Sequence, residues 1–470
     1  MRALWVGALT LGLLLGPAQG QYKNINPQVA KVVSEVSEDR ITAILKKLES
    51  FGTRNLSSSQ DDPVRGVGAA RQWIFDQLKG FSSRLEVSYE EYPVKKIAGK
   101  NTRVPNDVNL YNIVAVLPGK THPEQRVIVS AHYDTIASAG ASANAANATG
   151  RPDEVFVPAD PNGDAPGVTD DGSGVACVLE LARILSQSEF EKTLVFVAFS
   201  GEEEGLLGST LYAAKAKAND QKIEAVLNND IIGSDVSGSG RTANRSVSVF
   251  STDPNDSPAR TLARYVREIG ERYVPAMRVQ TIFREDRVSR GGDHTPFALE
   301  GFAAVRLSSP EEDYAHQHTA TDKFEFTSVP YIARVTQVNG AVAATLALAP
   351  PAPVVTEQVD RDGQKVTQIL LTRGESRYDA RLRWKESAAA DLAGYAVVMR
   401  STTAPLWERE VYVGNVTEYL MRDVSIDDLV FGVKAIDKEG NESLVSPYVP
   451  APRQRRAVQL VEVGDPEENN

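Results

Sequence analysis

Cysteine is almost absent from this chain. Cys177 is the single cysteine among 470 residues, so no intramolecular disulfide can form. It lies in an apolar stretch with helical spacing, Val175 to Leu185, which is typical of a buried structural thiol rather than a nucleophile. Reactive chemistry is therefore expected from other side chains.

An excess of positive charge is also missing. The chain has 51 Lys and Arg residues against 62 Asp and Glu residues, for a formal net charge of −11. Nucleic-acid binding calls for a clustered basic face, so we expect no nucleic-acid partner. A hydrophobic share of 42% and a charged share of 24% are those of a soluble globular protein. The length predicts two or more domains.

Long hydrophobic runs are confined to the N-terminus. Arg2 precedes an apolar run from Ala3 to Leu15, and small residues around Ala18 and Gly20 come before Gln21. This pattern predicts a signal peptide over residues 1–20. The run is too short to span a bilayer, so we expect no transmembrane anchor. The protein is predicted to be secreted or periplasmic.

Short apolar runs alternate with helical stretches through most of the chain. This predicts an α/β domain over residues 21–345, with a mainly parallel mixed sheet flanked by helices. The expected strands are 84–92, 112–117, 126–131, 193–199, 225–228 and 303–307, and the expected helices are 41–48, 69–78, 175–185, 209–218 and 258–269.

The C-terminal part has a different pattern. Clustered prolines at 346–353 predict a linker, and short alternating strands over 354–453 predict a small all-β sandwich domain. With Trp384 in an early strand and Tyr395 in a central one, this part resembles a fibronectin type III domain. Such a module could attach the protein to a surface or polymer. Residues 454–470 are expected to form an acidic, disordered tail.

Five motifs carry imidazoles and carboxylates, and several directly follow predicted strands. Because ligands bind beyond the carboxyl ends of the strands in open α/β sheets, the motifs are predicted to form one site. They are His132-Tyr-Asp134, Asp170-Asp171-Gly-Ser-Gly174, Glu202-Glu203-Glu204, Asn229-Asp230 and His318-Thr-Ala-Thr-Asp322.

These residue types favour a zinc site that activates water. Adjacent carboxylates such as Glu202 and Glu203 repel each other unless a cation compensates. One can bind metal while its neighbour takes a proton from water. Asp134 is placed two residues from His132, where its carboxylate can accept from the second ring N–H of the imidazole. Spacing alone does not choose between His318 and His316, and His294 is a third candidate, expected to have a structural role. Asp322, four residues after His318, is expected to be a partner of His318.

The five motifs in this order resemble the family that includes secreted bacterial zinc aminopeptidases, glutamate carboxypeptidases and animal glutaminyl cyclases. The resemblance covers roughly residues 27–345 and implies a zinc exopeptidase fold with two Zn²⁺ per chain. It implies that His132, Asp170 and Asp230 bind one ion and that Glu203, His318 and Asp170 bind the other. It further implies Glu202 as general base and Asp134 as the carboxylate that orients the histidine. The His-Thr-x-x-Asp motif selects His318 over His316.

The expected function is that of an exported zinc aminopeptidase, which removes N-terminal residues from peptides. A carboxypeptidase, a dipeptidase, a glutaminyl cyclase and a non-catalytic binding protein remain alternatives, and Co²⁺ or Mn²⁺ could share the ligands. Two positions bear on specificity. Gln317 stands where many aminopeptidases of the family have tyrosine, and Arg290 could orient a substrate carboxylate or carbonyl.

Overall fold

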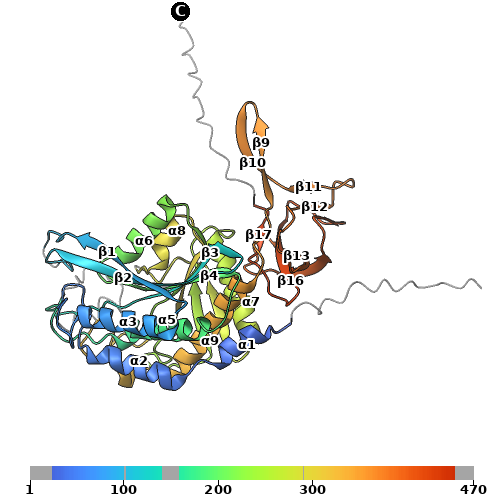
Figure 1. The fold of residues 1–470 in the computed structure, drawn as a ribbon. Coiled ribbons are helices and arrows are strands. Elements are labelled where there is room, and N and C mark those ends of the chain that lie inside the picture. Colours follow the sequence, from blue (N-terminus) through green and yellow to red (C-terminus); the bar gives the residue numbers. More distant parts are fainter. Residues whose placement is uncertain (1–23, 100–101, 140–157, 289, 450–470) are drawn as a thin grey trace, which may run out of the picture.

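The computed structural model describes residues 24–99, 102–139, 158–288 and 290–449 (Figure 1). The predicted signal peptide, the predicted acidic tail and residues 140–157 of the long stretch between His132 and Asp170 lie outside these ranges. Within the described ranges, no helix combines the length and the apolar character that crossing a membrane requires.

The core of the larger domain is a mixed sheet of eight strands. Four of its neighbouring pairs are parallel and three are antiparallel. Every residue of the central strand β4 is buried, as expected for a strand covered on both faces. In sheet order the strands are β1 (Glu86–Val94), β2 (Val108–Leu117), β4 (Lys192–Phe199), β3 (His122–His132), β5 (Lys222–Asn229), β8 (Ala304–Ser308), β6 (Ser246–Phe250) and β7 (Arg278–Ile282).

Helices cover both faces of this sheet (Figure 1). One face packs against α6 (Leu207–Ala218) and α8 (His294–Leu299) through an apolar cluster that includes Phe199, Tyr212 and Phe297. The other face carries the larger layer. Its helices are α1 (Pro27–Ser34), α2 (Glu38–Ser50), α3 (Val67–Phe81), α5 (Ser173–Leu185), α7 (Pro258–Tyr273) and α9 (Val329–Leu348), with the short segments η1 (Val168–Gly172) and η2 (Phe324–Phe326) nearby.

This architecture confirms the α/β fold class with a mixed sheet flanked by helices. Two strands were not anticipated, β6 and β7, which form one edge of the sheet. Each is five residues long, too short for alternation to stand out from loop sequence. Helix α9 ends at Leu348, so it occupies the first residues of the predicted proline-rich linker.

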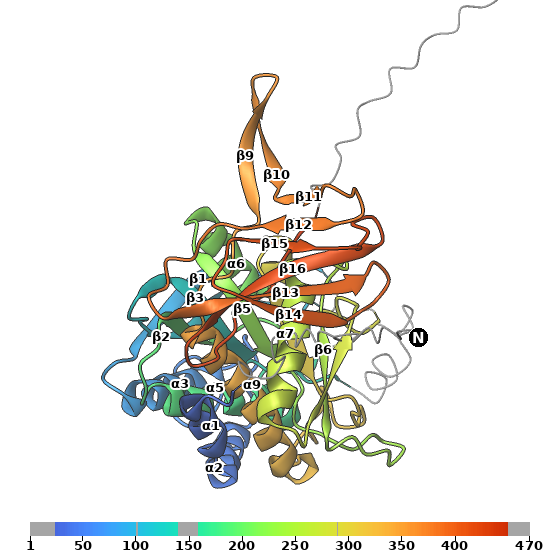
Figure 2. The same cartoon turned by 90° about the vertical axis from the view of Figure 1, so that its right-hand side faces the viewer.

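Two small antiparallel sheets follow α9 and share one apolar core (Figure 2). Trp384 and Tyr395 lie in that core with their ring centroids 5.3 Å apart. A separate hairpin projects away from them. The strands are β11 (Leu371–Arg373), β12 (Ala380–Arg383) and β15 (Glu418–Met421) in one sheet, β14 (Arg409–Gly414), β13 (Leu392–Ser401), β16 (Leu429–Asp437) and β17 (Ser446–Pro447) in the other, and β9 (Thr356–Arg361) with β10 (Gln364–Ile369) in the hairpin.

The β-module, residues 354–449, rests on helix α7 (Figure 2). The Lys434 side chain is 1% exposed and lies 3.2 Å from Glu268 of α7 and 3.0 Å from Glu410. It also contacts Glu442, which in turn pairs with Arg272 of α7 at 2.6 Å. Burial alone would lower the pKa of Lys434, but Glu268, Glu442 and Glu410 outweigh that effect and raise it. The two parts of the chain are thus joined by buried charges.

We predict that Lys434→Met destabilises the protein strongly. The substitution removes a buried cation from Glu442, Glu268 and Glu410. Because Arg272 still pairs with Glu442, the loss should reach at most the ~3–5 kcal/mol typical of a broken buried pair. Equilibrium denaturation should report this loss as a lower free energy of unfolding. Lys365→Met, at an exposed position of the hairpin, is the control and should change little. Equal stability of the two variants would contradict the role given to Lys434.

Candidate metal centre

The five motifs meet at the carboxyl edge of the parallel strands. His132 is the last residue of β3, Asp230 directly follows β5, and Glu203 lies in the turn after β4. Because β3 runs parallel to both β4 and β5, these strand ends lie side by side. The structure thus brings His132, Glu203 and Asp230 together at one edge of the sheet.

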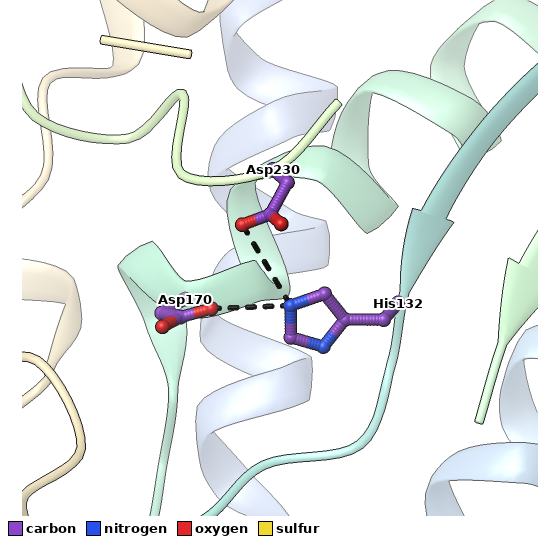
Figure 3. Close-up of side chains that lie close together, drawn as sticks. All are labelled: His132, Asp170 and Asp230. Carbon is purple, nitrogen blue, oxygen red and sulfur yellow. Dashed lines mark ion pairs between the residues drawn. The ribbon is translucent and has the colours of Figure 1, made fainter. Parts of the chain in front are cut away.

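The first group joins His132 to two carboxylates (Figure 3). His132 Nε2 lies 3.1 Å from Asp170 Oδ1 and 3.8 Å from Asp230 Oδ1. Both carboxylates point toward the same ring nitrogen (Figure 3). All three side chains are buried, so they face one another in a region of low dielectric.

The second group uses the other oxygen of the same aspartate. Asp170 Oδ2 lies 3.1 Å from His318 Nε2, and Glu203 Oε1 also lies 3.1 Å from that nitrogen. His318 holds a left-handed backbone with φ of 55°, a conformation that costs a residue other than glycine on the order of 1 kcal/mol. Asp170 therefore contacts two imidazoles, one with each of its carboxylate oxygens.

The residues fit a pair of metal ions. Each group offers one imidazole nitrogen and two carboxylate oxygens within 4.8 Å of one another, as zinc sites of the catalytic type require. Ligand atoms around a tetrahedral zinc lie roughly 3.3–3.5 Å apart, close to the separations found here. The donors are nitrogen and hard oxygen, and no thiolate takes part.

The electrostatics of the site are those of a crowded anionic cluster. Burial alone would raise the pKa of Asp170, but hydrogen bonds with His132 and His318 outweigh it and hold that pKa well below its usual range. Burial likewise favours neutral His318, yet Glu203 and Asp170 raise the pKa of its ring to about 9. In the metal-free protein the two histidines thus supply the positive charge that the carboxylates need.

The contact between His132 and Asp134 differs from the expected one. His132 Nδ1 lies 3.1 Å from the backbone oxygen of Asp134 and 3.8 Å from its carboxylate. The carboxylate instead accepts a hydrogen bond of 3.1 Å from the backbone N–H of Glu203. A carbonyl that accepts from Nδ1 still leaves Nε2 free for a metal. Asp134 therefore orients the ring through its main chain and positions the β4 turn through its side chain.

Two further aspartates hold the Asp170 segment in place. Asp171 belongs to neither ligand group and accepts hydrogen bonds from the backbone N–H groups of Gly174 at 2.9 Å and Ile231 at 3.2 Å. Asp322 accepts from the N–H of Thr169 at 2.9 Å and of Asp170 at 3.0 Å. The sequence suggested Asp322 as a partner of His318, whereas its carboxylate binds the Asp170 backbone.

Gly174 is required by this arrangement. A Cβ at that position would lie 2.3 Å from Asp171 Oδ2 and 2.5 Å from the backbone oxygen of Asn229. The motif thus needs glycine there for close packing rather than for flexibility.

A buried arginine, Arg54, escaped the sequence reasoning. It is fully buried and donates to the backbone oxygens of Tyr133 at 2.6 Å, Pro166 at 2.6 Å and Gly167 at 2.8 Å. Burial lowers its pKa to about 10, although Asp322 and Asp134 act in the opposite direction. Arg54 therefore ties the segment after β3 to the segment before Asp170. An isolated arginine in a loop gave no sequence signal of this role.

The other candidate histidines lie outside both ligand groups. His316 stacks on Phe326 with ring centroids 3.6 Å apart, and His294 is buried with its Nε2 2.8 Å from the backbone oxygen of Glu285. The Asp160 turn closes on itself, since the Gly163 N–H donates to the Asp160 backbone oxygen at 2.8 Å. Arg65 pairs with Asp164 of the same turn at 2.8 Å.

A cavity of about 280 Å³ opens beside the two groups. Glu202 lines it together with four of the metal-ligand candidates. Burial raises the pKa of Glu202 well above its usual value, and the nearby carboxylates of Asp230 and Glu203 add to this shift against the effect of His132. The remaining lining residues are Arg103, Gly205, Leu206, Ile231, Arg287, Arg290, Gly291, Arg306 and Gln317.

Comparison with known proteins identifies the family. The model of peptidase family M28 matches residues 112–343. A probable zinc metalloprotease of Pyricularia oryzae is 36% identical, with 87% of this chain and 82% of that protein covered. A probable zinc metalloprotease of Leptosphaeria maculans is 35% identical, with 90% and 96% covered. The chain belongs to peptidase family M28.

Solved structures share the fold of this M28 peptidase. LapB from Legionella pneumophila has a TM-score of 0.51 at 21% identity, covering 69% of this chain and 76% of its own. A Zn-dependent exopeptidase from Parabacteroides distasonis has a TM-score of 0.50 at 16% identity, with 66% and 99% covered. Glutaminyl cyclase from Porphyromonas gingivalis has a TM-score of 0.50 at 20% identity, with 66% and 98% covered. The sheet and its helices are thus of the zinc exopeptidase type.

We predict that Arg54→Met weakens both the M28 fold and its metal binding. Several buried carbonyls lose their donor, which costs on the order of 3 kcal/mol in unfolding free energy, and the Asp170 segment is released from the end of β3. Denaturation and zinc titration of the purified protein measure the two effects. The control is Arg65→Met, because the Arg65–Asp164 pair is largely exposed and such pairs contribute about 1 kcal/mol at most. Unchanged zinc affinity in Arg54→Met would contradict the assignment.

Zinc binding to the metal-free protein should release protons. His318, with a pKa of about 9 against an ordinary 6.5, is protonated at neutral pH and must become neutral to bind metal. Its protonation stabilises the metal-free fold below about pH 6.5, and this contribution is lost as pH rises through about 9. Calorimetry near pH 7.5 in buffers of different ionisation enthalpy measures the release. His122→Asn, at the opposite end of β3, should release as many protons as the unmodified protein, whereas zinc uptake without proton release would refute the expectation.

Proposed function

We propose that this M28 peptidase is an exported aminopeptidase that hydrolyses peptides with two zinc ions. The observation that carries the proposal is the position of Asp170 between two imidazole–carboxylate groups, one oxygen toward each. A single-metal site would need only one of these groups. The complete ligand set argues against a non-catalytic binding protein.

The residues divide into ligands and proton carriers. His132, Asp170 and Asp230 would hold one ion, and Asp170, Glu203 and His318 would hold the other. Two zinc ions bound there would polarise the substrate carbonyl and make water more acidic. The negative charge of Asp170, Glu203 and Asp230 would then be balanced by metal instead of by protonated histidines.

Glu202 is suited to the proton transfer. Glu202 lines the cavity next to both groups. A general base works best when its pKa lies near the pH of the reaction, and the raised pKa of Glu202 moves in that direction. In this proposal Glu202 accepts a proton from the attacking water and passes it to the leaving amine nitrogen. The turn that carries it is held by backbone hydrogen bonds of 2.9 Å from Gly205 and Leu206 to the Glu202 carbonyl.

The size of the cavity supports action at a chain end. About 280 Å³ is at the small end of ligand pockets and accommodates one or two residues rather than an extended polypeptide. A carboxypeptidase or dipeptidase would use the same scaffold. A glutaminyl cyclase is the other candidate, because one of the structures that share the fold is such an enzyme.

Hydrolysis of aminoacyl chromogenic amides tests the proposal. The mature protein should cleave amides with a free amine, lose activity on chelation and regain it with zinc. Glu202→Ala should lower kcat by about 100-fold or more, because general-base catalysis contributes that much. Amine-blocked counterparts are the matched control and should stay intact. Inactivity on every free-amine amide, with two zinc ions bound per chain, would exclude an aminopeptidase and direct the assay to carboxyl-terminal substrates.

A further inference from the structure

The wall of the cavity carries four arginines as well as the carboxylates of the metal centre. They are Arg103, Arg287, Arg290 and Arg306. Four guanidinium groups beside one small cavity repel one another unless anionic groups lie nearby. Arg287 and Arg306 have carboxylate partners within the protein, and Arg103 donates to the backbone oxygen of Glu203. Arg290 is the remaining arginine of the cavity wall.

Arg306 and Arg287 are neutralised by their surroundings. Arg306 lies 2.9 Å from Asp230 and 2.8 Å from Asp286. Arg287 lies 3.0 Å from Glu312 and 3.3 Å from Asp286. These pairs form one network at the cavity wall, so the charge of both arginines is already compensated.

Arg290 differs from these neighbours. Among the described residues, no carboxylate lies within ion-pair distance of its guanidinium. Its Nη2 donates to Gln317 Oε1 at a long 3.4 Å, and the guanidinium lies 5.8 Å from the ring centroid of Tyr314. The side chain is half-buried at the cavity wall, where a charge without a partner is costly.

The position of Arg290 links it to the metal centre. Gln317 receives its hydrogen bond and in turn donates from Nε2 to Asp170 Oδ2 at 2.7 Å. One amide side chain therefore separates the guanidinium from the carboxylate shared by both ligand groups. Gly292 allows the chain that carries Arg290 to pass close to the metal centre, since a Cβ on Gly292 would lie 3.2 Å from both Asp230 and Arg306.

The balance of charge around the cavity also favours an anionic partner for Arg290. Two doubly charged cations would offset the four carboxylates of the cavity, Asp170, Glu202, Glu203 and Asp230. Arg287 and Arg306 are paired to Glu312 and Asp286, whereas the described residues offer the Arg290 guanidinium no carboxylate within ion-pair distance. A substrate carboxylate fits such a position, because the planar guanidinium binds carboxylates through two parallel hydrogen bonds.

We propose that Arg290 is a specificity residue that binds a carboxylate of the substrate close to the scissile bond. The inference rests on the proposed function and names its substrate class, peptides with a carboxylate within one or two residues of the cleaved bond. That carboxylate can be an acidic side chain or the free terminus of a dipeptide. Both sources present the same group to Arg290.

The kinetic test compares Arg290→Gln and Arg290→Lys with unmodified enzyme. Substrates are glutamyl and alanyl anilides for the side-chain source, and the dipeptide Ala-Ala with its C-terminal amide for the terminal source. In Arg290→Gln, KM for the carboxylate-bearing member of at least one pair should rise about 10- to 100-fold, the expected loss for a charge-assisted bond. The neutral member should stay within about twofold. Arg290→Lys should recover part of the loss, and Arg245→Gln, at an exposed position away from the cavity, is the control.

An equilibrium measurement separates this inference from the proposed function. Calorimetry on zinc-loaded Glu202→Gln protein measures binding of Ala-Glu and Ala-Ala against their amides, with and without Arg290→Gln. Tighter binding of a carboxylate ligand that Arg290→Gln abolishes supports the inference, even if no peptide is hydrolysed. Equal weakening of acids and amides, or carboxylate binding that does not depend on Arg290, overturns the inference while leaving the hydrolysis results untouched.

Discussion

The mutual repulsion of buried carboxylates is the constraint on which this structure depends. Asp170 has ligand oxygens within 4.8 Å of those of both Asp230 and Glu203, and all three side chains are buried. In a low dielectric, such a cluster persists only if cations compensate it. Without metal, His132 and His318 must carry protons and Arg306 must face Asp230. Bound zinc would supply the positive charge itself, so the two histidines could lose their protons.

The sheet makes this crowding possible. Parallel strands β3, β4 and β5 end at the same edge, so residues far apart in sequence converge without any local turn designed for metal. The supporting contacts are mostly between side chains and backbone. Asp171, Asp322 and Arg54 hold the main chain of the ligand segments, so the ligands stay in place although their own charges repel one another.

Sequence reasoning reached much of this site because its residues occur as motifs at strand ends. It anticipated which imidazoles and carboxylates the fold brings together, and it gave the fold class. It missed Arg54, whose function depends on three carbonyls from distant segments. It also assigned the Asp134 carboxylate to His132, because spacing places a residue on a face but does not choose between its side chain and its carbonyl. It also missed the short edge strands β6 and β7, because their extended conformation depends on pairing within the sheet rather than on an alternating pattern in their own sequence.

The β-module takes part in stability rather than in the reaction centre. The alignment with the Pyricularia oryzae relative covers 87% of this chain, more than its first 350 residues can supply, so the match extends into the module. Yet every described residue that lines the cavity precedes residue 319. The module instead contacts α7, which packs against α9 and the β7–β8 side of the sheet. Its buried pairing with α7 supports the half of the sheet that carries Arg306, while the substrate recognition that we propose falls to Arg290, in the segment between β7 and α8.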